Sequence, residues 1–136
     1  MQGDKTVIQH LNKILKNELT AINQYFLHAK MLQDWGMTKL GDLVRAESID
    51  EMKHADELID RILFLAGLPN LQDHGRGGVG VNVDEIMRCV RALAMGALPD
   101  LRDAVAQGEG RGEGVGRGVC QRVRGGVGAR CDWSGP

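Results

Sequence analysis

The sequence predicts an all-α fold in which long helices pack as an antiparallel bundle. Its 136 residues are enough for one domain with a hydrophobic core. Two segments of the first half repeat apolar residues at spacings of three and four, which is the period of a helix with one buried face. Only a short turn around Gly36 separates these segments, so we expect the two helices to lie antiparallel.

The first helix is expected to run from Asp4 to about Trp35. Asp4 suits the N-cap because its carboxylate can accept hydrogen bonds from free backbone N–H groups, and Gly36 is a common terminator. The buried face is predicted to carry one carboxylate among apolar side chains. In order, its positions are Ile8, Leu11, Leu15, Glu18, Ile22, Tyr25, Ala29 and Leu32.

The second helix is expected to run from about Thr38 to Ala66, with Gly67 in the left-handed conformation that ends a helix and Pro69 just beyond. Three successive positions of its buried face hold ionisable residues where apolar ones are expected. In order, this face reads Leu40, Val44, Glu47, Glu51, His54, Leu58, Ile62 and Leu65. Buried charges are costly unless they are paired or bound to a metal, so this interruption is the strongest functional signal in the sequence.

The composition changes after about residue 75, since only four of the 19 glycines precede it. Residues 67–82 lack a periodic apolar pattern and are predicted to form a crossover loop along the bundle. A third helix is expected from about Val83, with its middle disrupted by Gly96 and Pro99 because both residue types disfavour a helix. After Gln107, frequent glycines leave little helical propensity.

Charge and cysteine content exclude several classes of protein. A formal net charge of -1 gives no overall attraction to nucleic acids or membranes. No basic-then-apolar leader and no long apolar run is present, so we expect a soluble protein with no membrane or nucleic-acid partner. Cys89, Cys120 and Cys131 form no Cys-x-x-Cys pair. An odd number of cysteines suits a reducing compartment, and a cytoplasmic location is expected.

Glu18, Glu51 and His54 form a pattern typical of an iron site. A Glu on one helix that faces a Glu-x-x-His on its neighbour is half of the carboxylate-bridged di-iron constellation of four-helix bundles. Tyr25 lies two turns after Glu18 on the same face, so its hydroxyl is expected near a bound metal. Met52 lies about 100° around the helix from Glu51 and is therefore expected to face outward.

Several motifs before about residue 74 resemble those of one known family. They are Asn-Glu-Leu at 17–19, Ala-Ile-Asn-Gln-Tyr-Phe-Leu-His-Ala at 21–29, Glu-Ser-Ile-Asp-Glu-Met-Lys-His-Ala-Asp at 47–56 and Arg-Ile-Leu-Phe-Leu at 61–65. In these motifs the sequence resembles the bacterioferritins, which are haem-containing iron-storage ferritins. The resemblance implies a ferritin-like antiparallel four-helix bundle with a long crossover between helices two and three, assembled as a homo-oligomeric shell of twenty-four subunits.

The resemblance also implies the roles of the central residues. It implies a ferroxidase whose di-iron centre oxidises Fe(II) with O₂ or peroxide and passes the iron to a mineral store. Glu18 would be a terminal ligand, Glu51 a bridging ligand and His54 a nitrogen ligand. Met52 would be the axial ligand of a haem b shared by two subunits across a two-fold axis.

Other polar residues of the first two helices are expected around this site. Glu47, one turn before Glu51, is expected to line an approach to the metal. Asp50 resembles an inner-surface iron contact of some family members, although Ala46 stands where those members have a histidine. His10 and His28 are expected at the surface or in the lining of a pore.

The second half departs from the family at its metal ligands. Ala94 occupies the glutamate position of the third helix, and Val127 and Arg130 occupy the second Glu-x-x-His. Three of the six ligands that the resemblance implies are therefore absent, so paired oxidation of two irons is expected to be impaired. Each replacement is reachable by one nucleotide change, which is typical of a misread region or a decaying gene.

The whole chain, 1–136, is interpreted as a single ferritin-like domain. It comprises a helical hairpin at 1–74, the crossover and third helix at 75–107, and a Gly/Arg-rich region at 108–136 whose fourth helix is weak or incomplete. One alternative is a non-catalytic shell or haem-binding subunit. Another is that the last region binds RNA through its arginines, which is disfavoured because aromatic residues are few there and Glu109 and Glu113 interrupt it.

Overall fold

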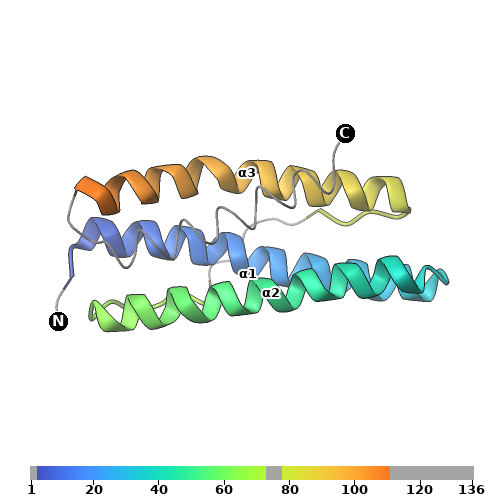
Figure 1. Cartoon of the computed structure of the whole chain (residues 1–136), viewed down its shortest axis with the longest axis horizontal. Helices are drawn as coiled ribbons and strands as arrows, with labels where there is room; N and C mark the ends of the chain where they lie inside the picture. Colours follow the sequence, from blue (N-terminus) through green and yellow to red (C-terminus); the bar gives the residue numbers. More distant parts are fainter. Residues whose placement is uncertain (1–2, 73–77, 111–136) are drawn as a thin grey trace.

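The computed structural model describes residues 3–72 and 78–110, which form three helices and no strand. Helix α1 spans Lys5–Asp34, α2 spans Thr38–Phe64 and α3 spans Val83–Gly110. In the view of Figure 1, α1 lies between α2 and α3, and it packs against both. The prediction of an all-α helical bundle is confirmed. None of the helices in this part of the chain is long and apolar enough to cross a membrane.

Several predictions concern positions outside the described residues. These are the weak fourth helix, the replaced ligands Val127 and Arg130, the cysteines Cys120 and Cys131, and the arginine-rich region. The backbone of Ala94 belongs to α3, but its side chain is likewise outside what the structure describes.

Both ends of α1 match the prediction. The Asp4 carboxylate accepts hydrogen bonds from the backbone N–H of Thr6 at 2.7 Å and of Val7 at 3.4 Å, as an N-cap does. At the other end Gly36 has a φ of 82°. Its N–H donates to the Gln33 carbonyl at 3.0 Å, and the Met37 N–H donates to the Leu32 carbonyl at 2.9 Å. This pair of bonds is the Schellman motif, which favours glycine at the left-handed residue.

Helix α2 ends with the same motif, but the predicted left-handed residue is wrong. The residue with positive φ is Ala66, at 59°, and α2 itself ends at Phe64. The Ala66 N–H donates to the Leu63 carbonyl at 3.0 Å, and the Gly67 N–H donates to the Ile62 carbonyl at 2.9 Å. Gly67 is needed for a different reason, because a Cβ there would lie 2.8 Å from Cγ2 of Ile8.

The two described ends of the connection between α2 and α3 lie against α1. Near its start, Asn12 donates through Nδ2 to the Leu68 carbonyl and accepts from the Asn70 N–H. Near its end, the Gly80 N–H donates to Nε2 of His28. Asn12 and His28 are about 24 Å apart along the helix axis at 1.5 Å per residue. The connection therefore returns the chain to the far end of α1, and α3 runs antiparallel to α1.

Helix α3 continues through Gly96 and Pro99, so the prediction that its middle is disrupted was wrong. Pro99 is exposed, whereas Ala97, Leu101 and Ala104 around it are buried in the core. This burial in the core beside α1 compensates for the poor local propensity, as tertiary packing commonly does. The helix also reaches Gly110, a few residues past the predicted end.

The core consists of two apolar clusters. The first includes Val7, Leu11, Ile14 and Leu15 of α1, Ala55, Leu58 and Ile62 of α2, Leu65, and Ala97, Leu101 and Ala104 of α3. The second includes Ala21, Tyr25, Ala29 and Leu32 of α1, Val44 of α2, and Ile86 and Val90 of α3. Buried polar residues of α1 and α2 lie between them along the chain, among them Glu18 and Glu51. The fold thus places a polar layer between two apolar ones.

Candidate metal centre

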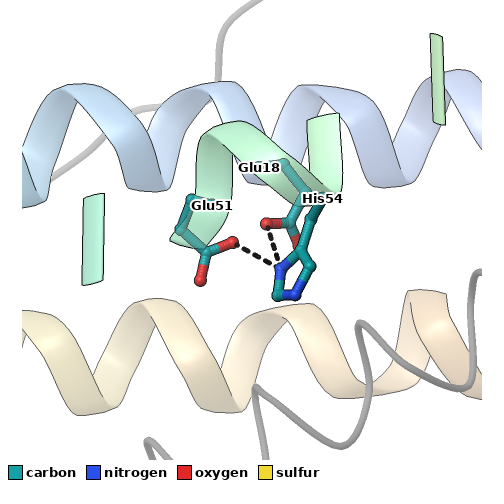
Figure 2. Close-up of side chains that lie close together, drawn as sticks. All are labelled: Glu18, Glu51 and His54. Atoms are coloured by element: carbon teal, nitrogen blue, oxygen red, sulfur yellow. Dashed lines mark hydrogen bonds and ion pairs between the residues drawn. The ribbon is translucent and has the colours of Figure 1, made fainter. Parts of the chain in front are cut away.

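The antiparallel packing of α1 and α2 brings Glu18, Glu51 and His54 together. The Ser48 hydroxyl donates to the Ile22 carbonyl at 2.9 Å, which fixes the register of the two helices one turn away from these residues. Glu18 is 2% and Glu51 0% exposed, and 19% of the His54 side chain is exposed. Figure 2 shows the two carboxylates converging on the His54 ring.

The distances between the three side chains fit one bound cation. Nδ1 of His54 lies 3.4 Å from Oε2 of Glu51 and 3.6 Å from Oε2 of Glu18. One ligand atom from each residue can be chosen so that all lie within 4.8 Å of one another. Donors that bind one ion at about 2.1 Å are separated by roughly 3.0–3.5 Å. The group is therefore only slightly wider than a closed coordination sphere.

The electrostatics of the group also favour a cation. Two buried carboxylates repel each other, and burying an unpaired carboxylate is expensive. Within the described residues, Oε2 of Glu18 is buried and accepts no hydrogen bond. His54 can offset one negative charge only when its imidazole is protonated. A bound divalent ion would compensate both carboxylates at once while leaving His54 neutral as a nitrogen donor.

The types of ligand narrow the choice of ion. Carboxylate oxygens suit Mg²⁺, Mn²⁺ and Fe(III), and imidazole nitrogen suits Fe(II) and Zn²⁺. A set of two carboxylates and one imidazole can therefore hold iron in both of its common oxidation states. Three donors also leave coordination positions for water or for a small reactant.

The other residues predicted near the metal are more scattered. Tyr25 is 1% exposed and belongs to the second apolar cluster. Glu47 is partly buried one turn before Glu51. Asp50 is exposed, and its carboxylate lies 3.8 Å from Nζ of Lys53. Neither these three residues nor any other described acidic residue, His or Cys joins Glu18, Glu51 and His54 in the candidate metal group.

Met52 lies on the outer side of α2, as its angular position predicts. It is 50% exposed, and Ile49, one turn before it on α2, is 44% exposed. Phe26, one turn after Ile22 on α1, is 51% exposed. The exposed thioether of Met52 offers a soft ligand on the outer surface of α2.

The prediction that His28 lies at the surface or in a pore lining was wrong. Its side chain is fully buried, and Nε2 accepts a hydrogen bond from the Gly80 N–H at 3.1 Å. Burial lowers the pKa of His28 below its ordinary value of 6.5, because a buried imidazolium loses its hydration. One feature of the sequence indicated this burial. Ile14, Ala21 and His28 recur every seven residues, next to the buried face that was predicted for the first helix.

Comparisons with known proteins agree with this architecture. The model of the ferritin-like domain family matches residues 8–115. Over 105 residues the chain is 49% identical to a bacterioferritin of Mycobacterium bovis, covering 77% of this chain and 66% of that protein. It is 51% identical over 105 residues to a bacterioferritin of Streptomyces coelicolor, covering 77% and 63%. It is 39% identical over 110 residues to a bacterial ferritin of Paramagnetospirillum magnetotacticum, covering 81% and 67%. The matched part of the chain spans just under two thirds of the length of the first two relatives.

Proposed function

The chain belongs to the ferritin-like family and, within it, to the bacterioferritins, and we propose that it serves iron storage with Fe(II) as the substrate of the Glu18, Glu51 and His54 group. The observation that carries this proposal is the burial of two carboxylates beside an imidazole, with one carboxylate oxygen left without a hydrogen-bond donor among the described residues. Such an arrangement is unfavourable without a cation and favourable with one.

Each ligand has a distinct task in this proposal. Glu18 and Glu51 neutralise the two charges of Fe(II) and stabilise the third charge that appears when the iron is oxidised. His54 must be neutral to use the Nδ1 lone pair, so a protonated imidazole would release its proton on iron binding. The electron lost by iron passes to O₂ or peroxide at a coordination position that these three residues leave open. The oxidised iron then leaves for a mineral store.

We further propose that the chain holds one iron at this site more readily than two. Ala94, Val127 and Arg130 stand at the positions where the family resemblance implies three more ligands, and none of these side chains can replace a carboxylate or an imidazole. Reduction of O₂ to peroxide takes two electrons, whereas one Fe(II) supplies one. Oxidation is therefore expected to be slower than at a site that holds two irons together.

The remaining roles belong to the same proposal. Met52 would supply an axial sulfur to a haem b held between two copies of the chain, and Phe26 and Ile49 would contact the apolar macrocycle. Two methionine sulfurs favour reduced haem iron and electron transfer. Glu47 would lie on the approach of Fe(II), Asp50 would meet iron at the inner surface, and the Tyr25 hydroxyl would support the iron ligands. A cytoplasmic homo-oligomeric shell completes the proposal.

Anaerobic Fe(II) titration followed by exposure to O₂ tests the central claim. We expect about one Fe(II) bound per chain and a slow rise of Fe(III) absorbance after O₂ is added. Binding should be lost in Glu18→Ala and in His54→Ala. Two irons per chain would contradict the one-iron site, and unchanged binding in both variants would contradict the assignment of the ligands. Iron that binds but does not oxidise would favour the alternative of a non-catalytic shell subunit.

A further inference from the structure

The last part of the connection before α3, residues 78–82, is fastened to α1 by two buried side chains. Oε1 of Gln24 accepts a hydrogen bond from the Gly78 N–H at 2.8 Å, and Nε2 of His28 accepts one from the Gly80 N–H at 3.1 Å. We call residues 78–82 the strap. Gly78 also lines a cavity of about 330 Å³ between α1 and α3, so the strap forms part of the wall of this cavity.

The strap also leads directly into the first turn of α3. Oδ1 of Asn82 accepts from the Glu85 N–H at 2.9 Å, and Oε2 of Glu85 accepts from the Val81 N–H at 3.0 Å. This reciprocal pair resembles a capping box. Gly80 is buried against the same turn, since a Cβ there would overlap the turn's backbone. Because Gly80 contacts both His28 and this turn, a strap that leaves α1 also disturbs the capped end of α3.

His28 can hold the strap only while its imidazole is neutral. Since Nε2 accepts the Gly80 N–H, the single ring proton of the neutral form is on Nδ1. Nδ1 is buried and finds no acceptor within residues 3–72 and 78–110. A second proton would bind to Nε2 and point at the Gly80 N–H, so that two donors would face each other. The imidazolium and this hydrogen bond are therefore incompatible.

The charged groups on the elements around His28 do not favour its protonation in the closed strap. The ionisable residues on neighbouring turns are Tyr25 and Lys30 on α1, Asp42, Arg45 and Glu47 on α2, and Asp84, Glu85 and Arg88 on α3, with none on the strap itself. Lys30 and Arg45 are exposed cations. Asp42 accepts from Gln33, and Asp84 pairs with Arg88 at 2.7 Å. The pKa of His28 is lowered, and its burial is the cause.

We propose that residues 78–82 form a proton-operated strap, in which protonation of His28 releases the Gly80 N–H and lets the strap leave α1, opening one wall of the cavity between α1 and α3. In the open form the imidazole meets water and regains an ordinary pKa near 6.5. Protons therefore bind the open form in preference, and a falling pH favours it. Between pH 7.5 and 5.5 the open fraction should rise up to about tenfold, because the protonated share of a hydrated imidazole sets this ratio.

Hydrogen exchange followed by mass spectrometry on the full chain tests the proposal. Rates are measured at pH 7.5 and 5.5 and divided by the intrinsic rate at each pH. Peptides that cover residues 78–82 should lose protection up to about tenfold at the lower pH, and should exchange well before peptides from the core of α1. Low concentrations of urea should hardly change their rates, because a local opening exposes little surface. If these peptides exchanged only together with α1 at every urea concentration, the strap would open by global unfolding and the proposal would be overturned.

Three variants identify the group that takes up the proton. His28→Gln keeps an acceptor near the position of Nε2 but does not titrate in this range, so protection of the strap should become the same at both pH values. A pH dependence that persists in this variant would overturn the proposal. His10→Gln removes an imidazole from the same helix and should keep the full dependence. Glu85→Gln weakens the other contact of the strap and should lower protection equally at both pH values, whereas a lost pH dependence there would assign the switch to Glu85 instead. The urea series on the unaltered chain decides the matter if His28→Gln does not fold.

Discussion

The hairpin of α1 and α2 and the region that follows it bury polar groups in different ways. Between α1 and α2, the buried groups are ionisable, and Glu18, Glu51 and His54 face one another. Where α1 meets the connection that follows the hairpin, the buried polar side chains are an amide and an imidazole: Gln24 and His28 accept hydrogen bonds from the backbone N–H groups of Gly78 and Gly80. The first arrangement is the one proposed to bind a cation, whereas the second ties the connection to α1. A single helix, α1, thus carries a ligand site on one side and a structural anchor on the other.

The largest expected effect is a loss of Fe(II) affinity in the hairpin without a loss in the free energy of unfolding. Glu51→Gln keeps the shape of the side chain but removes one of two buried negative charges. We expect the affinity for Fe(II), measured by anaerobic titration, to fall about 1,000-fold, equivalent to about 4 kcal/mol. Without metal, the free energy of unfolding should stay the same or rise, because a buried charge has been removed. Asp60→Asn is the matched control, since Asp60 is an exposed carboxylate of the same helix with no proposed role in iron binding. An equal loss of Fe(II) affinity in the control would contradict the specific role of Glu51 in binding iron.

The second effect belongs to the structural anchor. His28→Ala removes the acceptor of the Gly80 N–H and leaves a hole in a fully buried position. We expect a loss of about 3 kcal/mol in the free energy of unfolding, measured by denaturant titration at fixed protein concentration, and faster amide exchange at Gly80. Affinity for Fe(II) should not change. His10→Ala, at a partly buried position of the same helix, should cost much less. A drop in iron affinity as large as that of Glu51→Gln would show that the two sides of α1 are not independent.

The same histidine predicts how stability depends on pH. Burial lowers the pKa of His28 in the folded chain below 6.5, so at pH values under about 6.5 the unfolded chain binds the additional proton first. The free energy of unfolding should therefore fall as the pH decreases, by at most about 1.4 kcal/mol per pH unit from this one group. Replacing His28 with Asn should make the slope between pH 7 and 5 shallower. A slope that is unchanged in this variant would mean that other groups cause the acid sensitivity.

A smaller effect tests how α3 is held together. Pro99 is exposed in the middle of this helix, where it removes one backbone donor and strains the preceding turn. Pro99→Ala should raise the free energy of unfolding by about 1–2 kcal/mol, because part of the gain in the helix is offset by a more flexible unfolded chain. Helix content from circular dichroism should not fall. A destabilised variant would indicate that the packing of Ala97 and Leu101 depends on the local geometry that Pro99 imposes.

The hairpin could be predicted from its sequence because its signals are local. Asp4 and Gly36 mark the two ends of α1, and the apolar period of each helix identifies its buried face. The candidate metal group was predictable for the same reason, since Glu18, Glu51 and His54 interrupt that period at positions that antiparallel packing brings together. Local chemistry and tertiary structure agree in this part of the molecule, except at the left-handed residue after α2 and at the buried His28.

The rest could not be predicted because it depends on contacts between distant residues. The acceptor role of His28 requires Gly80, which lies 52 positions later in the chain. The continuity of α3 through Gly96 and Pro99 rests on burial of Leu101 and its neighbours in the core beside α1. Propensity alone gives no information on either contact, because both arise only after the crossover has placed α3 beside α1.

The smallest effect compares the two ends of the hairpin helices, which share one motif but not one residue. The left-handed position is Gly36 after α1 and Ala66 after α2, with φ of 82° and 59°. A Cβ costs energy in this conformation, so Ala66→Gly should raise the free energy of unfolding by about 0.5–1 kcal/mol, and Gly36→Ala should lower it by about 1 kcal/mol. Nothing lies within 4 Å of a Cβ built on Gly36, so the loss would report backbone strain rather than a clash. If neither variant changed the free energy of unfolding, the hydrogen bonds of the motif would have to tolerate a second backbone conformation. The left-handed residue at each helix end would then contribute less to the stability of the hairpin than its φ angle suggests.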